Sequence, residues 1–165
     1  MSNAADFAAI GLTLYAAHHV GDYWVQRDED ARHKGDPGRL GRLHCLLHVL
    51  SYLATQAACL VLVVLALGVK ISIIGLPAGL AVSGITHYIA DRREPLKRLA
   101  RMIPGKAAFL ELGVPRKRRV VAHWNEKEWD AVLDNPQLAT GLWALDQAWH
   151  IFWGVFVAAL LMAAL

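Results

Sequence analysis

The hydrophobic pattern of this chain is dominated by long apolar segments that carry no charge. Lys, Arg, Asp and Glu are absent from residues 7–21, 43–69, 71–90 and 147–165. Because a helix rises about 1.5 Å per residue, about 20 apolar residues match the hydrocarbon thickness of a bilayer. The pattern therefore predicts four membrane-spanning helices, at about 5–26, 42–68, 71–91 and 138–165.

Between the third and fourth of these segments lies a longer polar insertion, residues 92–136. Its first part, residues 92–103, combines apolar and basic positions with the period of a helix that lies on a membrane surface. Further along, Asn125 and Glu128 form the pattern of a helix N-terminal cap, which predicts a short helix at about 126–134. The expected fold class is thus all-α, an integral-membrane four-helix bundle with a helical cytoplasmic insertion.

Composition narrows the class of protein further. The chain has 165 residues, of which 56% are hydrophobic and 19% are charged, and its length suggests one domain, residues 1–165. Four uncharged segments of this length argue against a soluble enzyme, a disordered tail and a nucleic-acid module. The N-terminus lacks the basic region and cleavage site of a signal peptide. Cys45 and Cys59 form no CxxC pair, which excludes a thiolate zinc site.

The positions of the basic residues predict the orientation in the membrane. Residues 27–42 carry five Lys or Arg and residues 92–130 carry eleven, whereas the turn between the second and third spans holds only Lys70. By the positive-inside rule, both basic loops lie in the cytoplasm and both termini lie on the other side. The cluster Arg116–Arg119 is typical of contact with anionic lipid. It lacks the interleaved aromatic residues of a nucleic-acid site.

Ionisable residues inside the expected spans form a regular pattern. Three aspartates each have a histidine four residues away, and the second span adds two histidines with the same spacing. The pairs are His18/Asp22, His87/Asp91, Asp146/His150 and His44/His48. Residues at i and i+4 share one helix face, so both side chains of a pair can reach one metal ion.

The order of residues within each pair follows the direction of its helix. His precedes Asp in spans one and three, which run toward the cytoplasm, and follows Asp in span four, which runs away from it. Each aspartate therefore lies nearer to cytoplasmic water, with its histidine one turn deeper. Because ionisable groups in a membrane usually face a partner or a cavity, we expect the eight side chains to meet in one layer of the bundle.

The donor set of this layer indicates a metal. Five imidazoles and three carboxylates suit Zn²⁺, Mn²⁺ or Fe²⁺, and eight ligands can serve one to three divalent ions, of which zinc is favoured. Two other interpretations stay open: histidine–aspartate hydrogen bonds that join the helices, and a proton or ion relay. The relay is disfavoured because the outer halves of spans two to four hold no acidic or basic residue.

These motifs carry a family resemblance. The segment 18–26 resembles the His-x3-Asp-Tyr/Phe-x2-Gln signature of a family of small bacterial and phage membrane proteins of unknown function. Later motifs of that family resemble a loop with Lys34, HCLLHVL at 44–50, HYIAD at 87–91 and DQAWH at 146–150. The spacings are also similar to those of membrane-bound metal-dependent hydrolases and, more distantly, of zinc-dependent phospholipase C and zinc nucleases. The resemblance implies a multi-pass protein of the bacterial inner membrane.

The resemblance and the metal-binding pattern together imply a membrane-embedded hydrolase that acts on a phosphoester, with a lipid head group as a candidate substrate. All eight paired residues are expected as ligands, and Asp91, at the water boundary, is also the expected proton acceptor. Gln26 and Gln147 are candidates for hydrogen bonds to the ligands. The candidate phosphate-binding residues are Arg42, Arg92 and Arg93.

Two further functions compete with a hydrolase. The first is a non-enzymatic membrane protein of the phage or prophage type, which binds or excludes another component and holds a structural metal. The second is an ion or proton translocator. Asp91→Asn should abolish turnover in an enzyme, whereas in a structural protein it should lower stability and expression.

Overall fold

The computed structural model of the chain describes residues 3–113, 116–119, 129–132 and 140–165. These residues belong to two compact units. The first unit consists of Met1–Leu96 and Asp146–Leu165, and the second consists of Lys97–Leu145. All four predicted histidine-containing pairs belong to the first unit.

Long helices make up the first unit. α1 (Asn3–Val20) continues into a π-helical segment, η1 (Gly21–Val25), and a short helix, α2 (Asp28–His33), follows. Two long helices come next, α3 (Gly38–Leu67) and α4 (Gly75–Asp91). The helical prediction for the first three apolar segments is therefore confirmed, whereas α2 lies in a segment where no helix was predicted.

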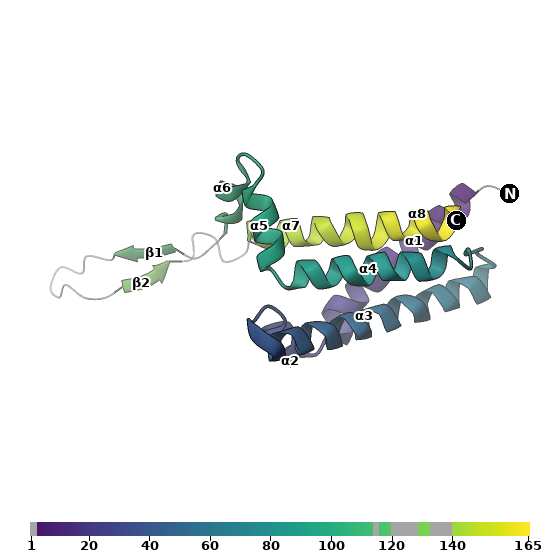
Figure 1. Cartoon of the computed structure of the whole chain (residues 1–165), viewed down its shortest axis with the longest axis horizontal. Coiled ribbons are helices and arrows are strands. Elements are labelled where there is room, and N and C mark those ends of the chain that lie inside the picture. The colour runs from purple at the N-terminus through teal and green to yellow at the C-terminus, as the bar shows by residue number, and fades with distance from the viewer. Residues whose placement is uncertain (1–2, 114–115, 120–128, 133–139) are drawn as a thin grey trace. The chain divides into compact units, whose positions relative to one another are not determined.

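The last helix of the chain is continuous but changes its winding. It begins as α7 (Gly141–Trp149), continues as the π-helical segment η2 (His150–Val157) and ends as α8 (Ala158–Ala164). Within the first unit, α1 packs against α3, η2 and α8, and α4 packs against α3, η2 and α8 (Figure 1). Four helices that are separated in the sequence therefore lie side by side.

The interior of the first unit changes character along these helices. An apolar core fills one end and consists of Ile10, Leu14, Leu60, Val155, Ala158, Ala159 and Met162. The next layer is polar: Gln56 Nε2 donates to Tyr52 Oη (2.9 Å), and Ser83 Oγ donates to Gln56 Oε1 (3.0 Å). One helical turn beyond this network lie His48 on α3 and His87 on α4. The polar network thus separates the apolar core from the histidine layer.

Two helices of the described chain are long and apolar enough to cross a membrane. They are Gly38–Leu67 and Gly141–Ala164, whose most apolar windows have mean hydropathies of 2.2 and 1.6. The shorter helices α1 and α4, with 18 and 17 residues, are not among them. By length and composition, the structure therefore supports membrane crossing for two of the four predicted spans.

The second unit contains most of the predicted insertion. The expected helix at 92–103 is present as α5 (Glu94–Arg101), which begins at the end of the first unit, and α6 (Lys106–Leu110) follows. Two strands, β1 (Arg116–Arg119) and β2 (Trp129–Val132), then pair in antiparallel register.

The predicted helix at 126–134 is wrong over the four residues of β2. Pairing with β1 outweighs the local capping pattern there, since strand formation depends strongly on a partner strand that a local pattern does not reveal. The capping residues themselves, Asn125 and Glu128, lie outside the described residues.

Candidate metal centre

Seven of the eight predicted ligands gather at one end of the first unit. Six helical segments contribute them: His18 from α1, Asp22 from η1, His48 from α3, His87 and Asp91 from α4, Asp146 from α7 and His150 from η2. The four histidines are at most 1% exposed. The common layer predicted from the sequence thus exists for these seven side chains.

Four ligand atoms converge at the centre of this group. His48 Nε2 and His87 Nε2 lie 2.9 Å apart. Asp91 Oδ2 lies 3.1 Å from the first nitrogen and 3.2 Å from the second, and Asp22 Oδ1 lies 3.5 Å from each. Bonds of about 2.0–2.1 Å to a tetrahedral ion would separate its ligand atoms by about 3.3–3.4 Å. The five distances are close to the ligand separations around one ion.

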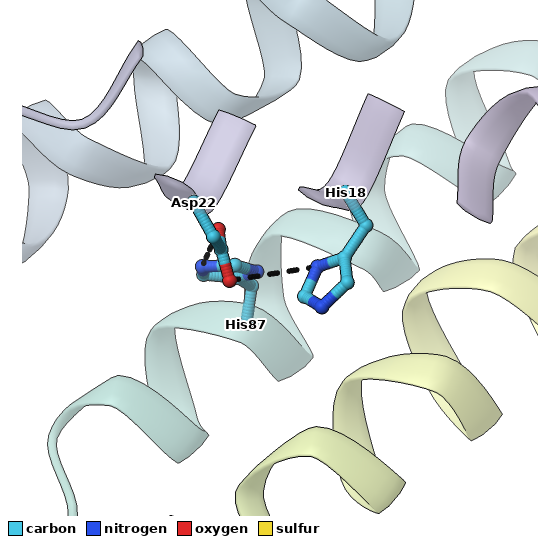
Figure 2. A group of neighbouring side chains, drawn as sticks. All are labelled: His18, Asp22 and His87. Carbon is cyan, nitrogen blue, oxygen red and sulfur yellow. Dashed lines mark ion pairs between the residues drawn. The ribbon is translucent and has the colours of Figure 1, made fainter. Parts of the chain in front are cut away.

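The carboxylate of Asp22 lies between two histidine rings (Figure 2). Its Oδ1 faces His87 Nε2 at 3.5 Å, whereas its Oδ2 lies 3.6 Å from His18 Nδ1. The two oxygens of one carboxylate are therefore directed at different histidines.

Both π-helical segments carry residues of this group. Asp22 is the second residue of η1, and His150 is the first residue of η2. π-Helical turns are rare and occur frequently at functional sites. Gly21 permits the close approach of η1 to α3, since a Cβ atom there would lie 2.9 Å from Tyr52 Cδ2.

Hydrogen bonds on the outer side of the cluster fix the orientation of three histidine rings. The Gln26 amide satisfies its neighbours when its oxygen faces His48 and its nitrogen faces the Asp22 carbonyl. The three contacts are His18 Nε2 to Gln147 Oε1 (3.3 Å), His48 Nδ1 to Gln26 Oε1 (3.3 Å) and His150 Nδ1 to the Asp146 carbonyl oxygen (2.7 Å). Each acceptor requires the proton on the outer nitrogen, so the inner nitrogen of a neutral ring presents a lone pair.

Several buried atoms of the group have no hydrogen-bond partner among the described residues. They are His18 Nδ1, Asp22 Oδ1, His87 Nδ1, Asp91 Oδ2 and His150 Nε2. A proton on His87 Nε2 can be donated to His48 or to a carboxylate oxygen, but the contacts of a neutral His48 Nε2 with Asp91 Oδ2 and Asp22 Oδ1 remain between acceptors. Buried polar atoms are costly without a partner, and a cation would supply one for the inward lone pairs.

The loop between η1 and α3 closes over the aspartate end of α4. Lys34 Nζ lies 2.8 Å from Asp91 Oδ1 and 3.0 Å from the Gln26 amide oxygen. Arg92 donates to the carbonyl oxygens of Lys34 (2.7 Å) and Asp36 (2.6 Å), and Arg93 donates to that of Ala31 (3.4 Å). Two of the three arginines predicted to hold phosphate therefore bind loop carbonyls.

The third of these arginines, Arg42, is exposed on α3. It lies near the beginning of that helix, six residues before His48. None of the three arginines thus contacts the seven clustered side chains in the interactions that the structure records.

His44 is the predicted ligand that lies elsewhere. Its Nδ1 contacts Asp30 Oδ1 at 2.7 Å, and its ring lies 5.4 Å from that of His33. His44 and His48 do share one face of α3, but His44 lies one turn nearer to the loop, where α2 covers it. Asp30 is 3% exposed in this pair. His44 is therefore a partner of α2 and not a member of the cluster.

The sequence pattern did not indicate that Lys34, Asp30 and Tyr52 contact predicted ligands. Lys34 belongs to the loop of the family resemblance, but nothing in its spacing indicated that it pairs with Asp91. The Tyr52 ring packs on that of His87, with centroids 3.9 Å apart. The spacing of four residues from His48 to Tyr52 and Gln56 was the available signal for a polar face on α3.

Comparison with known proteins adds no relative. No protein-family model matches the chain, and no significant match is found among curated proteins or solved structures. The candidate function therefore depends on the geometry of the site.

Proposed function

We propose that the clustered side chains bind a divalent metal ion and that the protein is a metal-dependent hydrolase of phosphoesters. The observation that carries this proposal is the convergence of two imidazole nitrogens and two carboxylate oxygens, in which each nitrogen lies 2.9–3.5 Å from the other nitrogen and from both oxygens. Mixed nitrogen and oxygen donors without a thiolate suit Zn²⁺, and also Mn²⁺ or Fe²⁺. The chemistry that such an ion supplies is Lewis-acid activation of water and of a phosphoryl oxygen.

The residues around the ligands are suited to hold them in one protonation state. Gln26 accepts a hydrogen bond from His48, and Gln147 accepts one from His18. Lys34 neutralises the outer oxygen of Asp91 and leaves its inner oxygen directed at the histidines. Partners of this kind fix the ring orientation of metal ligands and raise their affinity for the ion.

We assign the role of proton acceptor to Asp146 and not to Asp91, the residue expected from the sequence. One oxygen of Asp91 pairs with Lys34, the other lies 3.1–3.2 Å from His48 Nε2 and His87 Nε2 among the proposed metal ligands, and its side chain is 4% exposed. The Asp146 side chain is 22% exposed and is the most accessible carboxylate of the cluster. A general base must reach both water and the reacting centre, which fits Asp146.

The exposed surface of α3 and α4 carries large apolar side chains, which favours a substrate at the membrane surface. Leu62, Leu65 and Ile85 are 66%, 79% and 61% exposed, and apolar surfaces of this kind mark contact with lipid or with another protein. The cluster lies at the end of the helices that carries the basic loop. We therefore propose that the substrate is a phosphorylated lipid head group at the cytoplasmic face of a bacterial inner membrane, where the basic insertion faces anionic lipid.

Metal analysis of detergent-purified protein tests the binding step. The wild-type protein should retain a stoichiometric divalent metal after mild extraction, and His48→Gln should lose most of it. His19→Gln is the matched control, because His19 lies on α1 beside His18 but its ring packs between Tyr15 and Tyr23. A wild-type protein that contains no metal, even after dialysis against Zn²⁺, would contradict the proposal.

One observation favours a second function, a non-enzymatic membrane protein with a structural metal. The set of His48, His87, Asp91 and Asp22 already contains four protein ligands, and structural zinc sites are closed by four such ligands, whereas catalytic sites keep one position open. In that case the ion would stabilise the joined helices, and no substrate would reach it.

Turnover distinguishes the two functions. We expect the metal-loaded protein to release phosphate from phosphatidic acid in mixed micelles, and Asp146→Asn to lose turnover while it keeps its tetrahedrally bound metal. Under the structural alternative, the wild type has no activity, and removal of the metal only lowers the unfolding temperature. Asp6→Asn is a suitable control, because Asp6 lies at the far end of α1 beside Lys70.

A further inference from the structure

We propose that a second divalent cation binds beside the first, held by His18 Nδ1, His150 Nε2 and Asp22 Oδ2, with one coordination position open. The inference rests on the proposed function and deepens it, because it assigns the open site to which a phosphate group would bind. None of these three atoms belongs to the first set, which consists of His48 Nε2, His87 Nε2, Asp91 Oδ2 and Asp22 Oδ1.

The two histidines present buried lone pairs without a partner. His18 Nδ1 and His150 Nε2 have no hydrogen-bond partner among the described residues, and the side chains are 0% and 1% exposed. Their outer nitrogens contact the Gln147 amide and a backbone carbonyl, so both inner nitrogens are acceptors. Two buried acceptors of this kind require a donor or a cation.

The spacing of the two rings fits one shared ion. The ring centroids of His18 and His150 lie 5.3 Å apart with an interplanar angle of 25°. Two imidazoles on one tetrahedral ion, with bonds of about 2.0–2.1 Å, have centroids about 5 Å apart. The rings of His48 and His87, which belong to the first set, have a similar centroid distance of 4.9 Å.

Asp22 connects the two sets. Its Oδ1 lies 3.5 Å from both nitrogens of the first set, whereas its Oδ2 lies 3.6 Å from His18 Nδ1. A carboxylate with its oxygens directed at different ligand groups is suited to bridge two ions. Paired ions about 3.5–4 Å apart are the arrangement that stabilises both the attacking and the leaving oxygen of a phosphoester.

The second set has three protein ligands, as catalytic sites do. Asp146 is the neighbouring carboxylate, since its Oδ2 lies 3.5 Å from His150 Nδ1, on the outer edge of the ring whose Nε2 would hold the ion. Its side chain is 22% exposed, more than those of Asp22 and Asp91. Water can therefore reach the carboxylate that we assign as proton acceptor on this side of His150.

The charges of the cluster indicate which ligand would take the open position. Asp22, Asp91 and Asp146 together with Lys34 carry a net charge of about minus two, which one divalent ion neutralises. A second ion makes the cluster positive, so an anion is required to balance it. A phosphate or phosphoester group supplies that charge and two oxygens that can contact both ions.

Metal stoichiometry tests this inference in full-length, detergent-purified protein. The wild type, dialysed against Zn²⁺ with inorganic phosphate, should bind two zinc ions per chain. Phosphate should raise the affinity for the second ion only. His150→Ala and His18→Ala should each lower the stoichiometry from two to one. His19→Ala, a histidine outside the cluster, should keep two.

The outcomes separate this inference from the proposed function. No bound ion in the wild type overturns both. One ion in the wild type, with or without phosphate, overturns the second site and leaves the first. If the alanine variants fail to fold, Mn²⁺-loaded wild-type protein still decides: a magnetically coupled spin pair supports two adjacent ions, and an isolated Mn²⁺ signal at saturating Mn²⁺ contradicts them.

Discussion

Lys34 Nζ lies 2.8 Å from Asp91 Oδ1, and the two side chains are 13% and 4% exposed. This ion pair joins the loop that carries α2 to the end of α4, directly beside the clustered histidines. It also explains how Asp91 can stay ionised in a nearly buried position, since one oxygen has a cationic partner and the other faces the metal ligands.

Replacing Lys34 by methionine should destabilise the protein by about 3 kcal/mol, because loss of one partner leaves a buried carboxylate without compensation. Equilibrium unfolding in detergent measures this change. Lys70→Met is the control, because Lys70 is exposed at the opposite end of the helices, and its substitution should change stability by less than about 0.5 kcal/mol. Equal effects of the two substitutions would show that the ion pair contributes nothing.

Gln147→Leu should weaken binding of the second ion, which His18 would hold, without removing a ligand. Gln147 accepts from His18 Nε2 at 3.3 Å and so keeps His18 Nδ1 free for an ion. Loss of such a partner typically lowers affinity about 10–100-fold. Competition with a chelator measures the affinity. Gln56→Leu removes the buried hydrogen bonds of Gln56 to Tyr52 and Ser83, and should lower stability while the affinity stays near the wild-type value.

His44→Ala should leave the metal content unchanged, although the sequence pattern included His44 among the ligands. The expected effect is on stability, since Asp30 loses its partner at 2.7 Å and α2 loses a contact with α3. Elemental analysis of His44→Ala beside His48→Gln checks this. A loss of metal in both variants would mean that His44 does reach the cluster.

The contrast between His44 and His48 defines what the sequence could predict. The i, i+4 spacing identified the helix face, and the order of His and Asp identified the end of the bundle at which the pairs meet. Six of the seven side chains that meet lie on α1, η1, α3, α4 and η2, which pack together, and Asp146 lies one turn before His150. His44 differs because α2, a short helix that the hydrophobic pattern does not reveal, covers the first turns of α3.

Local sequence patterns could not predict contacts between segments that are distant in the sequence. Lys34 and Asp91 are far apart in the sequence, and only the packed structure brings them to 2.8 Å. The strand Trp129–Val132 exists through its pairing with Arg116–Arg119, a tertiary effect that a local helix-capping pattern does not contain.

Arg92→Ala should loosen the loop over the cluster. The Arg92 guanidinium donates to the carbonyl oxygens of Lys34 and Asp36, which lie in the turn between α2 and α3. We expect faster amide hydrogen exchange in residues 31–36, because the loop loses two charge-assisted hydrogen bonds of about 1.5–3 kcal/mol each. Arg42→Ala, on the exposed face of α3, is the control and should leave this exchange unchanged. Unchanged exchange in Arg92→Ala would argue that Lys34, His44 and Arg93 hold the loop without Arg92.

Gly79→Ala should disturb the packing of α4 against α8 and leave metal binding unchanged. A Cβ atom at Gly79 would lie 2.8 Å from the carbonyl oxygen of Ala158 and 2.7 Å from Met162 Cε, so α4 and α8 could no longer approach as closely. Overpacking of this kind costs about 1–3 kcal/mol. Gly11→Ala is the matched control, because its Cβ would meet the Ala159 Cβ at an ordinary 3.8 Å. Gly79 lies in the apolar part of α4, two turns from His87, so the variant should unfold at a lower temperature and yet bind metal with the wild-type stoichiometry. A loss of metal in Gly79→Ala would mean that the spacing of α4 and α8 controls the geometry of the cluster.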